Sequence, residues 1–161
     1  MESWQKPMIK ITKGYKKVDF DALLQINDLC YEGDERPPKE TFAQMLEFSE
    51  VWVAYSNGVS EQTDWRPVGF IIVNEMANCN LYLWSMAVLS VYRGQGIGGR
   101  MLQLVCMQYT NRATELHCRV DNPVQKMYFD YGFRVVDITR DYYKIDGKNI
   151  DGLKMRREVA G

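Results

Sequence analysis

The sequence predicts a mixed α/β fold, in which a central sheet carries helices on its faces. The elements expected along the chain follow the order βααβββαβαββ, without internal repeats or low-complexity segments. The composition, with 46% hydrophobic and 25% charged residues, is that of a soluble globular protein. Residues 1–161 have the usual length of one domain with a single core, so we expect one domain.

The first quarter of the chain is expected to contain one strand and two helices. Alternating apolar and polar residues predict a strand at 8–12, and Asp19 opens a helix that runs toward Cys30. The segment 31–38 combines Gly, Pro and charge, which predicts a loop. Pro38 suits the first position of a second helix, because that position needs no backbone N–H.

The middle of the chain is expected to form strands. Residues 51–55 and 68–74 are strand-like, and the polar stretch between them, which contains Pro67, predicts an antiparallel pair with a long connection. Residues 81–88 give the strongest strand pattern. The remaining elements are a helix ending near Asn111, a strand at 115–120, a helix at 124–131 between Pro123 and Gly132, and strands at 133–138 and 151–157 around a Gly-containing loop.

Bulk properties exclude several classes of protein. The net charge of −1 and pI of about 5.9 provide no positive field for nucleic acid, so no nucleic-acid partner is expected. No apolar run approaches the roughly 20 residues that span a bilayer, and residues 1–14 lack a signal-peptide pattern. Four cysteines without C-x-x-C spacing indicate a reduced, cytoplasmic setting, and a single histidine favours no metal site.

A glycine-rich segment between the strand at 81–88 and the next helix is the strongest functional signal. Backbone N–H groups and the positive end of a helix converge there on an anion such as a pyrophosphate. A glycine-rich turn without a ligand remains the plain structural alternative. The segment consists of Arg93, Gly94, Gln95, Gly96, Ile97, Gly98 and Gly99.

Three known phosphate-binding loops overlap in this segment. A Walker A loop would need Lys and Ser or Thr after its last glycine, but Arg100 and Met101 follow Gly99. A dinucleotide-binding G-x-G-x-x-G is present, with Asp121 near the expected distance. In that fingerprint, however, the glycines directly follow the strand, and most of the domain follows them. The third pattern, R-x-x-G-x-G, begins at Arg93.

The R-x-x-G-x-G pattern resembles the acetyl-CoA loop of the GNAT superfamily of N-acetyltransferases. Residues 83–88 resemble the family strand that splays from its neighbour. Residues 122–128, with Gly132-Phe133, are similar to the family motif N-x-x-A-x-x-L-Y-x-x-x-G-F. Within the superfamily, residues 29–31 and 141–143 resemble the ribosomal-protein alanine N-acetyltransferase branch. The resemblance implies a mixed, mostly antiparallel central sheet with helices on both faces.

The resemblance also implies which residues bind acetyl-CoA. The backbone of Met86, Ala87 and Val88 would follow the pantetheine arm, with the Val88 N–H as oxyanion donor. Residues 93–99 would hold the pyrophosphate, with Asn122 nearby in the cofactor site. Tyr128 occupies the position of the family's general acid, although packing of the last helix onto the sheet is an alternative role.

A general base is needed to accept the proton of the amine. His117 aligns with the strand on which the branch carries a glutamate base, and an unperturbed pKa near 6.5 suits the role. A structural histidine, a water-relayed base and Glu75 are the alternatives. The loop with Glu32, Asp34 and Glu35 and the pair Tyr142-Tyr143 are expected to flank the acceptor side, or the loop is simply solvated.

The function implied by the resemblance is acetyl transfer from acetyl-CoA to a primary amine, either a protein N-terminus or a small molecule. The amine attacks directly, and a homodimer is possible. Two alternatives of other classes remain, namely a CoA-binding module without catalysis and a dinucleotide-binding oxidoreductase.

Overall fold

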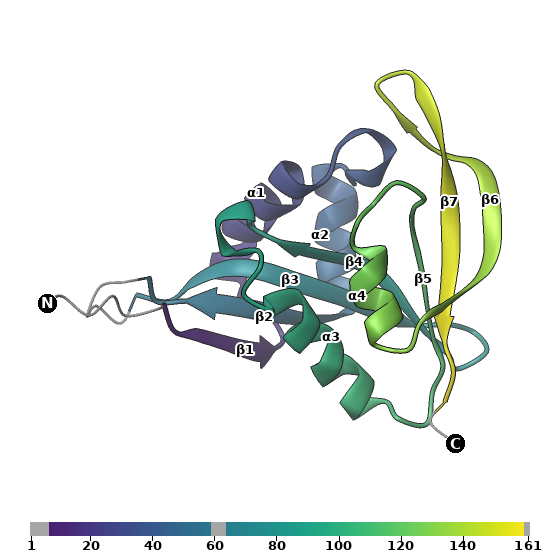
Figure 1. The fold of residues 1–161 in the computed structure, drawn as a ribbon. Coiled ribbons are helices and arrows are strands. Elements are labelled where there is room, and N and C mark those ends of the chain that lie inside the picture. The colour runs from purple at the N-terminus through teal and green to yellow at the C-terminus, as the bar shows by residue number, and fades with distance from the viewer. Residues whose placement is uncertain (1–6, 59–63, 160–161) are drawn as a thin grey trace, which may run out of the picture.

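Residues 7–58 and 64–159 are described by a computed structural model, in which one sheet of seven strands has the order β1-β2-β3-β4-β5-β7-β6 (Figure 1). The strands are β1 (Ile9–Lys13), β2 (Glu50–Ser56), β3 (Arg66–Glu75), β4 (Leu81–Val88), β5 (Thr114–Arg119), β6 (Arg134–Ile145) and β7 (Lys148–Arg157). The helices are α1 (Phe20–Cys30), α2 (Lys39–Phe48), α3 (Ile97–Gln108) and α4 (Gln125–Asp130). The predicted order of elements is therefore confirmed.

Neighbouring strands are antiparallel except for β4 and β5, which are parallel. That pairing is short, because it joins only residues 81–83 to residues 114–116. Beyond these residues the two strands diverge, and the second half of β4 has no strand on its β5 side. The splayed strand predicted at 83–88 is therefore present, and it opens the sheet at its centre.

Helices cover both faces of the sheet, as expected. Leu23 and Ile26 of α1, together with apolar side chains of α2, form one core cluster with Phe70 and Ile72 of β3. Helices α3 and α4 form the other cluster, to which β3 contributes Ile71. Because alternate β3 side chains enter opposite clusters, the strand is buried on both faces, which explains its unbroken run of apolar residues.

The C-terminal hairpin is the largest departure from the predicted elements. A Gly-containing loop was expected between strands at 133–138 and 151–157, but β6 and β7 continue to a two-residue turn. Asp146 and Gly147 form this turn with φ values of 51° and 73°, the conformation of a type I′ hairpin. Most β6 side chains are exposed, so the strand lacks the buried-exposed alternation that would reveal its length.

Smaller differences concern the ends of elements. Pro67 lies within β3 rather than in the connection, at a point where the register with β2 shifts. Helix α3 ends at Gln108, short of Asn111. Helix α4 begins at Gln125, because the Asn122 side chain accepts a hydrogen bond from the Val124 N–H at 3.0 Å and holds the preceding residues in a turn.

Some predictions fall partly on residues outside the described range. The connection between β2 and β3 includes residues 59–63, and the segment 1–14 begins with residues 1–6. Within residues 7–58 and 64–159, no helix is long and apolar enough to cross a membrane.

Candidate active site

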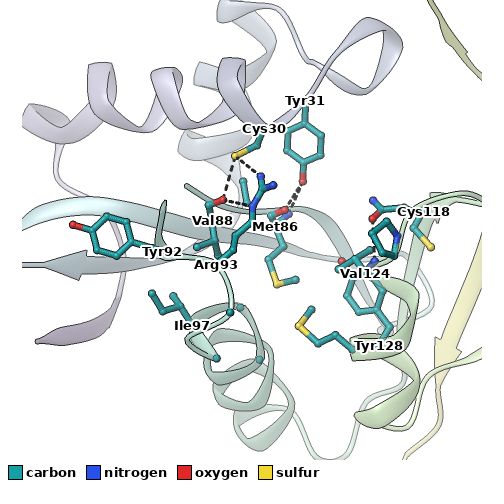
Figure 2. Close-up of a pocket in the computed structure, with 18 of the residues that line it drawn as sticks. Cys30, Tyr31, Met86, Val88, Tyr92, Arg93, Ile97, Cys118, Val124 and Tyr128 are labelled. Atoms are coloured by element: carbon teal, nitrogen blue, oxygen red, sulfur yellow. Dashed lines mark hydrogen bonds between the residues drawn. The ribbon is translucent and has the colours of Figure 1, made fainter. Parts of the chain in front are cut away.

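A cavity of about 590 Å³ opens where β4 and β5 diverge (Figure 2). Four segments form its wall: the loop after α1, the second half of β4, the glycine loop with the start of α3, and the end of β5 with α4. The lining residues are Cys30, Tyr31, Glu35, Met86, Ala87, Val88, Tyr92, Arg93, Gly94, Gly96, Ile97, Gly98, Gly99, His117, Cys118, Asn122, Pro123, Val124, Met127 and Tyr128.

The glycine loop delivers the N-terminus of α3 to this cavity. Gly94 and Gly96 have φ values of 79° and 77°, a left-handed conformation that side chains with a Cβ rarely adopt. No atom lies within 4 Å of a Cβ built on either residue, so the space in front of the loop is open. The N–H groups at the start of this 12-residue helix have no partner within the helix. The loop therefore suits an anion such as a pyrophosphate.

Arg93 connects the glycine loop to β4. Its Nε donates to the Val88 carbonyl oxygen at 3.0 Å, and its guanidinium lies 3.6 Å from the Cys30 sulfur (Figure 2). The side chain thus holds the end of β4 and lies beside the cavity. Gln95, by contrast, is exposed and is absent from the cavity wall, so it is the one predicted cofactor residue that the structure leaves outside.

Tyr31 reaches across the cavity to the backbone of β4 (Figure 2). Its hydroxyl donates to the Met86 carbonyl oxygen at 2.5 Å and accepts from the Met86 N–H and from the Ser85 hydroxyl, both at 3.0 Å. Burial raises the pKa of Tyr31 to about 12, so the hydroxyl keeps its proton. The Met86 backbone, which we expected beside the pantetheine arm, is therefore bonded to Tyr31.

The Val88 N–H points into the gap left by β5. The Leu89 N–H donates to the Val68 carbonyl oxygen at 2.9 Å, so Leu89 faces β3. In an antiparallel pair this direction alternates along the strand, which turns the N–H groups of Val88 and Met86 away from β3. Since the Met86 N–H is bonded to Tyr31, Val88 offers the backbone donor at this point of the cavity wall.

His117 lies on the cavity wall within a group of aromatic residues. Its Nδ1 is hydrogen-bonded to the Tyr82 hydroxyl, and its ring stacks on Tyr142 with centroids 4.8 Å apart and an interplanar angle of 11°. Burial, and then the charge of Lys154, lower the pKa of His117 below its usual 6.5, although nearby carboxylates oppose the shift. The imidazole is therefore neutral at neutral pH.

Tyr82 was not singled out from the sequence. It pairs with Glu115 across β4 and β5, so only the register of these strands brings it beside His117. Burial is the main cause that raises the pKa of Tyr82, and the charge of Tyr142 adds to it, so its phenol is neutral. Strand pairing would have been the signal that identifies it.

Tyr128 lines the cavity from α4, and it also packs against the sheet. Its side chain is buried, and its ring meets Phe133 edge-on with centroids 5.7 Å apart. Burial, followed by the charge of Tyr31, raises its pKa well above 10, which keeps the phenol protonated. Both roles considered for Tyr128 are thus compatible with its position.

Comparison with known families identifies this arrangement. Residues 47–135, more than half of the chain, match the family model described as the acetyltransferase (GNAT) domain. The chain belongs to the GNAT acetyltransferase family. The enzyme class predicted from the sequence, an acetyl-CoA-dependent N-acetyltransferase, is that of the family, and homologous GNAT proteins use acetyl-CoA as the acyl donor.

Solved GNAT structures share the whole architecture. The ribosomal-protein-S18-alanine N-acetyltransferase of Escherichia coli is 21% identical, with a TM-score of 0.80 and 96% of each chain covered. Arabidopsis thaliana NAA60 in complex with acetyl-CoA is 19% identical, with a TM-score of 0.82, and the match covers 96% of this chain and 100% of that one. At these identities the likeness shows the fold, which confirms the predicted fold class.

A further relative matches this chain in sequence over most of its length. The uncharacterized protein ML0378 of Mycobacterium leprae (strain TN) is 26% identical over 145 residues, which are 88% of this chain. The match covers 38% of that relative, so the GNAT chain spans about two fifths of its length.

Several other predicted site residues can now be placed in the GNAT fold. Asn122 lines the cavity, although its side-chain oxygen caps the turn before α4. Glu75, an alternative base, forms an ion pair with Arg112 at 3.0 Å and lies opposite Leu81, at the far end of β4 from the cavity. Its position argues against a role as base.

The residues that we expected to flank the acceptor lie in a loop and a hairpin that contact each other. Asp34 accepts a hydrogen bond from the Lys144 N–H at 3.0 Å, which ties the loop after α1 to β6. Glu32 and Glu35 both contact Arg119 of β5. Glu32 and Asp34 are exposed, so the alternative of a solvated loop remains open beside these contacts.

Side chains that could bind a metal ion are scattered. Among residues 7–58 and 64–159, no three His, Cys, Asp or Glu side chains come together in a way that would hold one. The four cysteines are free thiols in the described part of the chain.

Proposed function

We propose that this chain transfers the acetyl group of acetyl-CoA to the α-amino group at the N-terminus of a protein or peptide. One observation carries the proposal: a single cavity joins the anion-binding glycine loop to His117 and Tyr128. The residues proposed to bind the donor, to act as the base and to act as the acid therefore line the same cavity. The acceptor class is supported by the similar Escherichia coli enzyme, which is a ribosomal-protein-S18-alanine N-acetyltransferase.

Acetyl-CoA supplies the acetyl group as a thioester, an activated acyl donor. The N–H groups of the glycine loop would hold its pyrophosphate, and the second half of β4 would follow its pantetheine arm. A carbonyl oxygen that becomes negative during the reaction needs a fixed donor. The Val88 N–H, turned away from β3, would fill this role.

His117 would accept the proton of the attacking amine. In the tautomer that suits this role, His117 Nδ1–H donates to the Tyr82 hydroxyl and Nε2 is left unprotonated to act as the base. A lowered pKa favours this role, because it keeps the ring unprotonated at neutral pH.

Tyr128 would donate its proton to the departing sulfur. The amine nitrogen forms a bond to the acetyl carbon, the carbon–sulfur bond breaks, and the phenol proton passes to the thiolate. The proton held by His117 and the one lost by Tyr128 then exchange with solvent, so the net products are an amide and a free thiol. The raised pKa keeps the Tyr128 phenol protonated before the reaction, so its proton is available when the thiolate departs.

Aromatic side chains support a peptide acceptor. Tyr142 stacks on His117, and Tyr143 meets Tyr142 edge-on with ring centroids 4.9 Å apart. Both residues belong to β6, beside the loop after α1 that β6 contacts through Asp34. Aromatic rings that pack beside the cavity-lining His117 are suited to holding an extended backbone.

An assay with a set of different amine acceptors tests the proposal. Release of the CoA thiol would be measured with peptides that have free N-termini, the same peptides blocked by N-terminal acetylation, and small amines. Free peptides should react and blocked peptides should not. If only small amines reacted, the chain would be a small-molecule acetyltransferase.

Thermal shifts separate the two remaining classes. Acetyl-CoA and CoA should each raise the melting temperature, whereas NAD(P) should not. Stabilisation by NAD(P) alone would indicate an oxidoreductase. Stabilisation by CoA, without thiol release across the whole panel, would indicate a binding module without catalysis.

A further inference from the structure

Glu35 is the one acidic residue among the described residues that line the main cavity. The other charged residue of the wall is Arg93, and His117 is neutral at neutral pH. The two charges come from different segments, since Arg93 belongs to the glycine loop and Glu35 to the loop after α1. The cavity therefore has a positive residue beside the donor loop and a negative residue on the acceptor loop.

Glu35 also lines a second cavity, of about 420 Å³, that shares a wall with the first. This outer cavity lies between the loop after α1 and the end of β5. Glu35 is thus at the junction of the two cavities. The outer cavity's charged lining consists of Glu32, Glu35, Arg36, Arg93, Arg119 and Asp121.

The arginines of this region are engaged by other acceptors. Asp121 holds Arg119 through two hydrogen bonds of 2.9 and 2.8 Å. Arg36 donates its Nε to the Tyr31 carbonyl oxygen at 2.7 Å. Glu35 keeps only a 3.3 Å contact with one nitrogen of Arg119, and Glu32 contacts the same nitrogen at 3.4 Å.

The Glu35 carboxylate is therefore poorly compensated for a buried charge. Its side chain is 12% exposed, and three carboxylates share the one guanidinium of Arg119. Burial raises the pKa of Glu35, even though Arg119 opposes the shift. A carboxylate with little water and one long contact gains more from an additional cation than an exposed carboxylate does.

The charge of Glu35 also affects the pKa of residues in and beside the main cavity. It raises the pKa of Tyr31, Cys118, Tyr128 and Tyr143, although burial is the larger cause for each. These residues belong to the loop after α1, β5, α4 and β6. A cation that approaches from the acceptor side is therefore attracted by Glu35 close to the reacting groups.

We propose that Glu35 determines acceptor specificity by binding a second positive charge next to the reacting amine, so that N-termini with Lys or Arg as the second residue are preferred. This inference rests on the proposed function. It adds a substrate class to the same site, because every acceptor has the reacting amine but only some carry the second charge.

The test compares three peptides that differ only in the second residue, which is Lys, Gln or Glu. For the wild-type protein we expect kcat/KM to be about tenfold higher with Lys than with Gln, and lower again with Glu. In Glu35→Gln the Lys-to-Gln ratio should fall to about 1, and because it is a ratio it cancels any change in rate that is common to both peptides. Glu40→Gln is the matched control, because Glu40 is exposed on α2 and lines neither cavity.

Two further measurements keep the test decisive. In the wild-type protein, added salt should reduce the Lys-to-Gln ratio, a readout that does not depend on how the variant folds. Calorimetry should show weaker binding of the Lys peptide, but not of the Gln peptide, to the CoA complex of Glu35→Gln.

The outcomes distinguish the inference from the proposed function. An unchanged Lys-to-Gln ratio in folded Glu35→Gln, or a wild-type ratio near 1, would overturn the role of Glu35 while acetyl transfer to peptides stands. Absence of thiol release with every free peptide would overturn the proposed function, and the role of Glu35 with it.

Discussion

Replacement of Tyr31 by Phe tests whether the loop after α1 is fixed to the catalytic strand. The substitution removes one hydroxyl and three hydrogen bonds, two to the Met86 backbone and one to Ser85. A net hydrogen bond is worth about 0.5–1.5 kcal/mol, but water in the adjacent cavity can replace part of the loss. We therefore expect the free energy of unfolding to fall by about 2 kcal/mol.

Thermal denaturation is the assay, and the expected loss corresponds to about 4–8 °C in Tm for a chain of this size. Tyr15→Phe is the matched control, because Tyr15 packs on the same core cluster and forms none of these hydrogen bonds. Acetyl-CoA should bind the Tyr31→Phe protein at least as tightly as the wild type, since the Met86 backbone is then free. An unchanged Tm would refute the hydrogen-bonding argument, and weaker acetyl-CoA binding would refute the competition between Tyr31 and the cofactor.

Three further predictions concern catalysis and packing. The acidic limb of the pH profile of kcat/KM should lie below pH 6.5, because burial lowers the pKa of His117 and the base is active above it; persistence of this limb in His117→Ala would exclude that base. Tyr128→Phe should reduce kcat by about 10²-fold or more while acetyl-CoA still binds, and intact turnover would contradict the acid role. Gly69→Ala should destabilise the fold by about 1–3 kcal/mol in chemical denaturation, because its Cβ would lie 2.8 Å from the Ala87 carbonyl oxygen of β4. Gly98→Ala, whose nearest contact would be 3.6 Å, should keep its stability, and equal losses in both variants would contradict the packing argument.

Local patterns in the sequence determined the order of the elements and the donor side of the site. The glycine loop, the strand before it and the helix after it are consecutive in the chain, so spacing alone places them together. Gly94 and Gly96 adopt positive φ values, a conformation that glycine accepts more readily than other residues, so the sequence itself indicates this turn. The sequence did not predict the full length of β6, because a mostly exposed strand lacks the alternation of buried and exposed residues.

Only the tertiary structure decided the side of the cavity opposite the glycine loop, because its contacts join residues that are distant in sequence. Tyr82 and His117 are 35 positions apart, and Tyr31 and Met86 are 55 apart. Glu35 and Arg119 are separated by 84 positions. Such contacts depend on strand register and on how a loop packs across the sheet, which local periodicity does not specify. The sequence therefore predicted the family, whereas the arrangement of Tyr31, Tyr82 and Glu35 around the cavity became visible only in the fold.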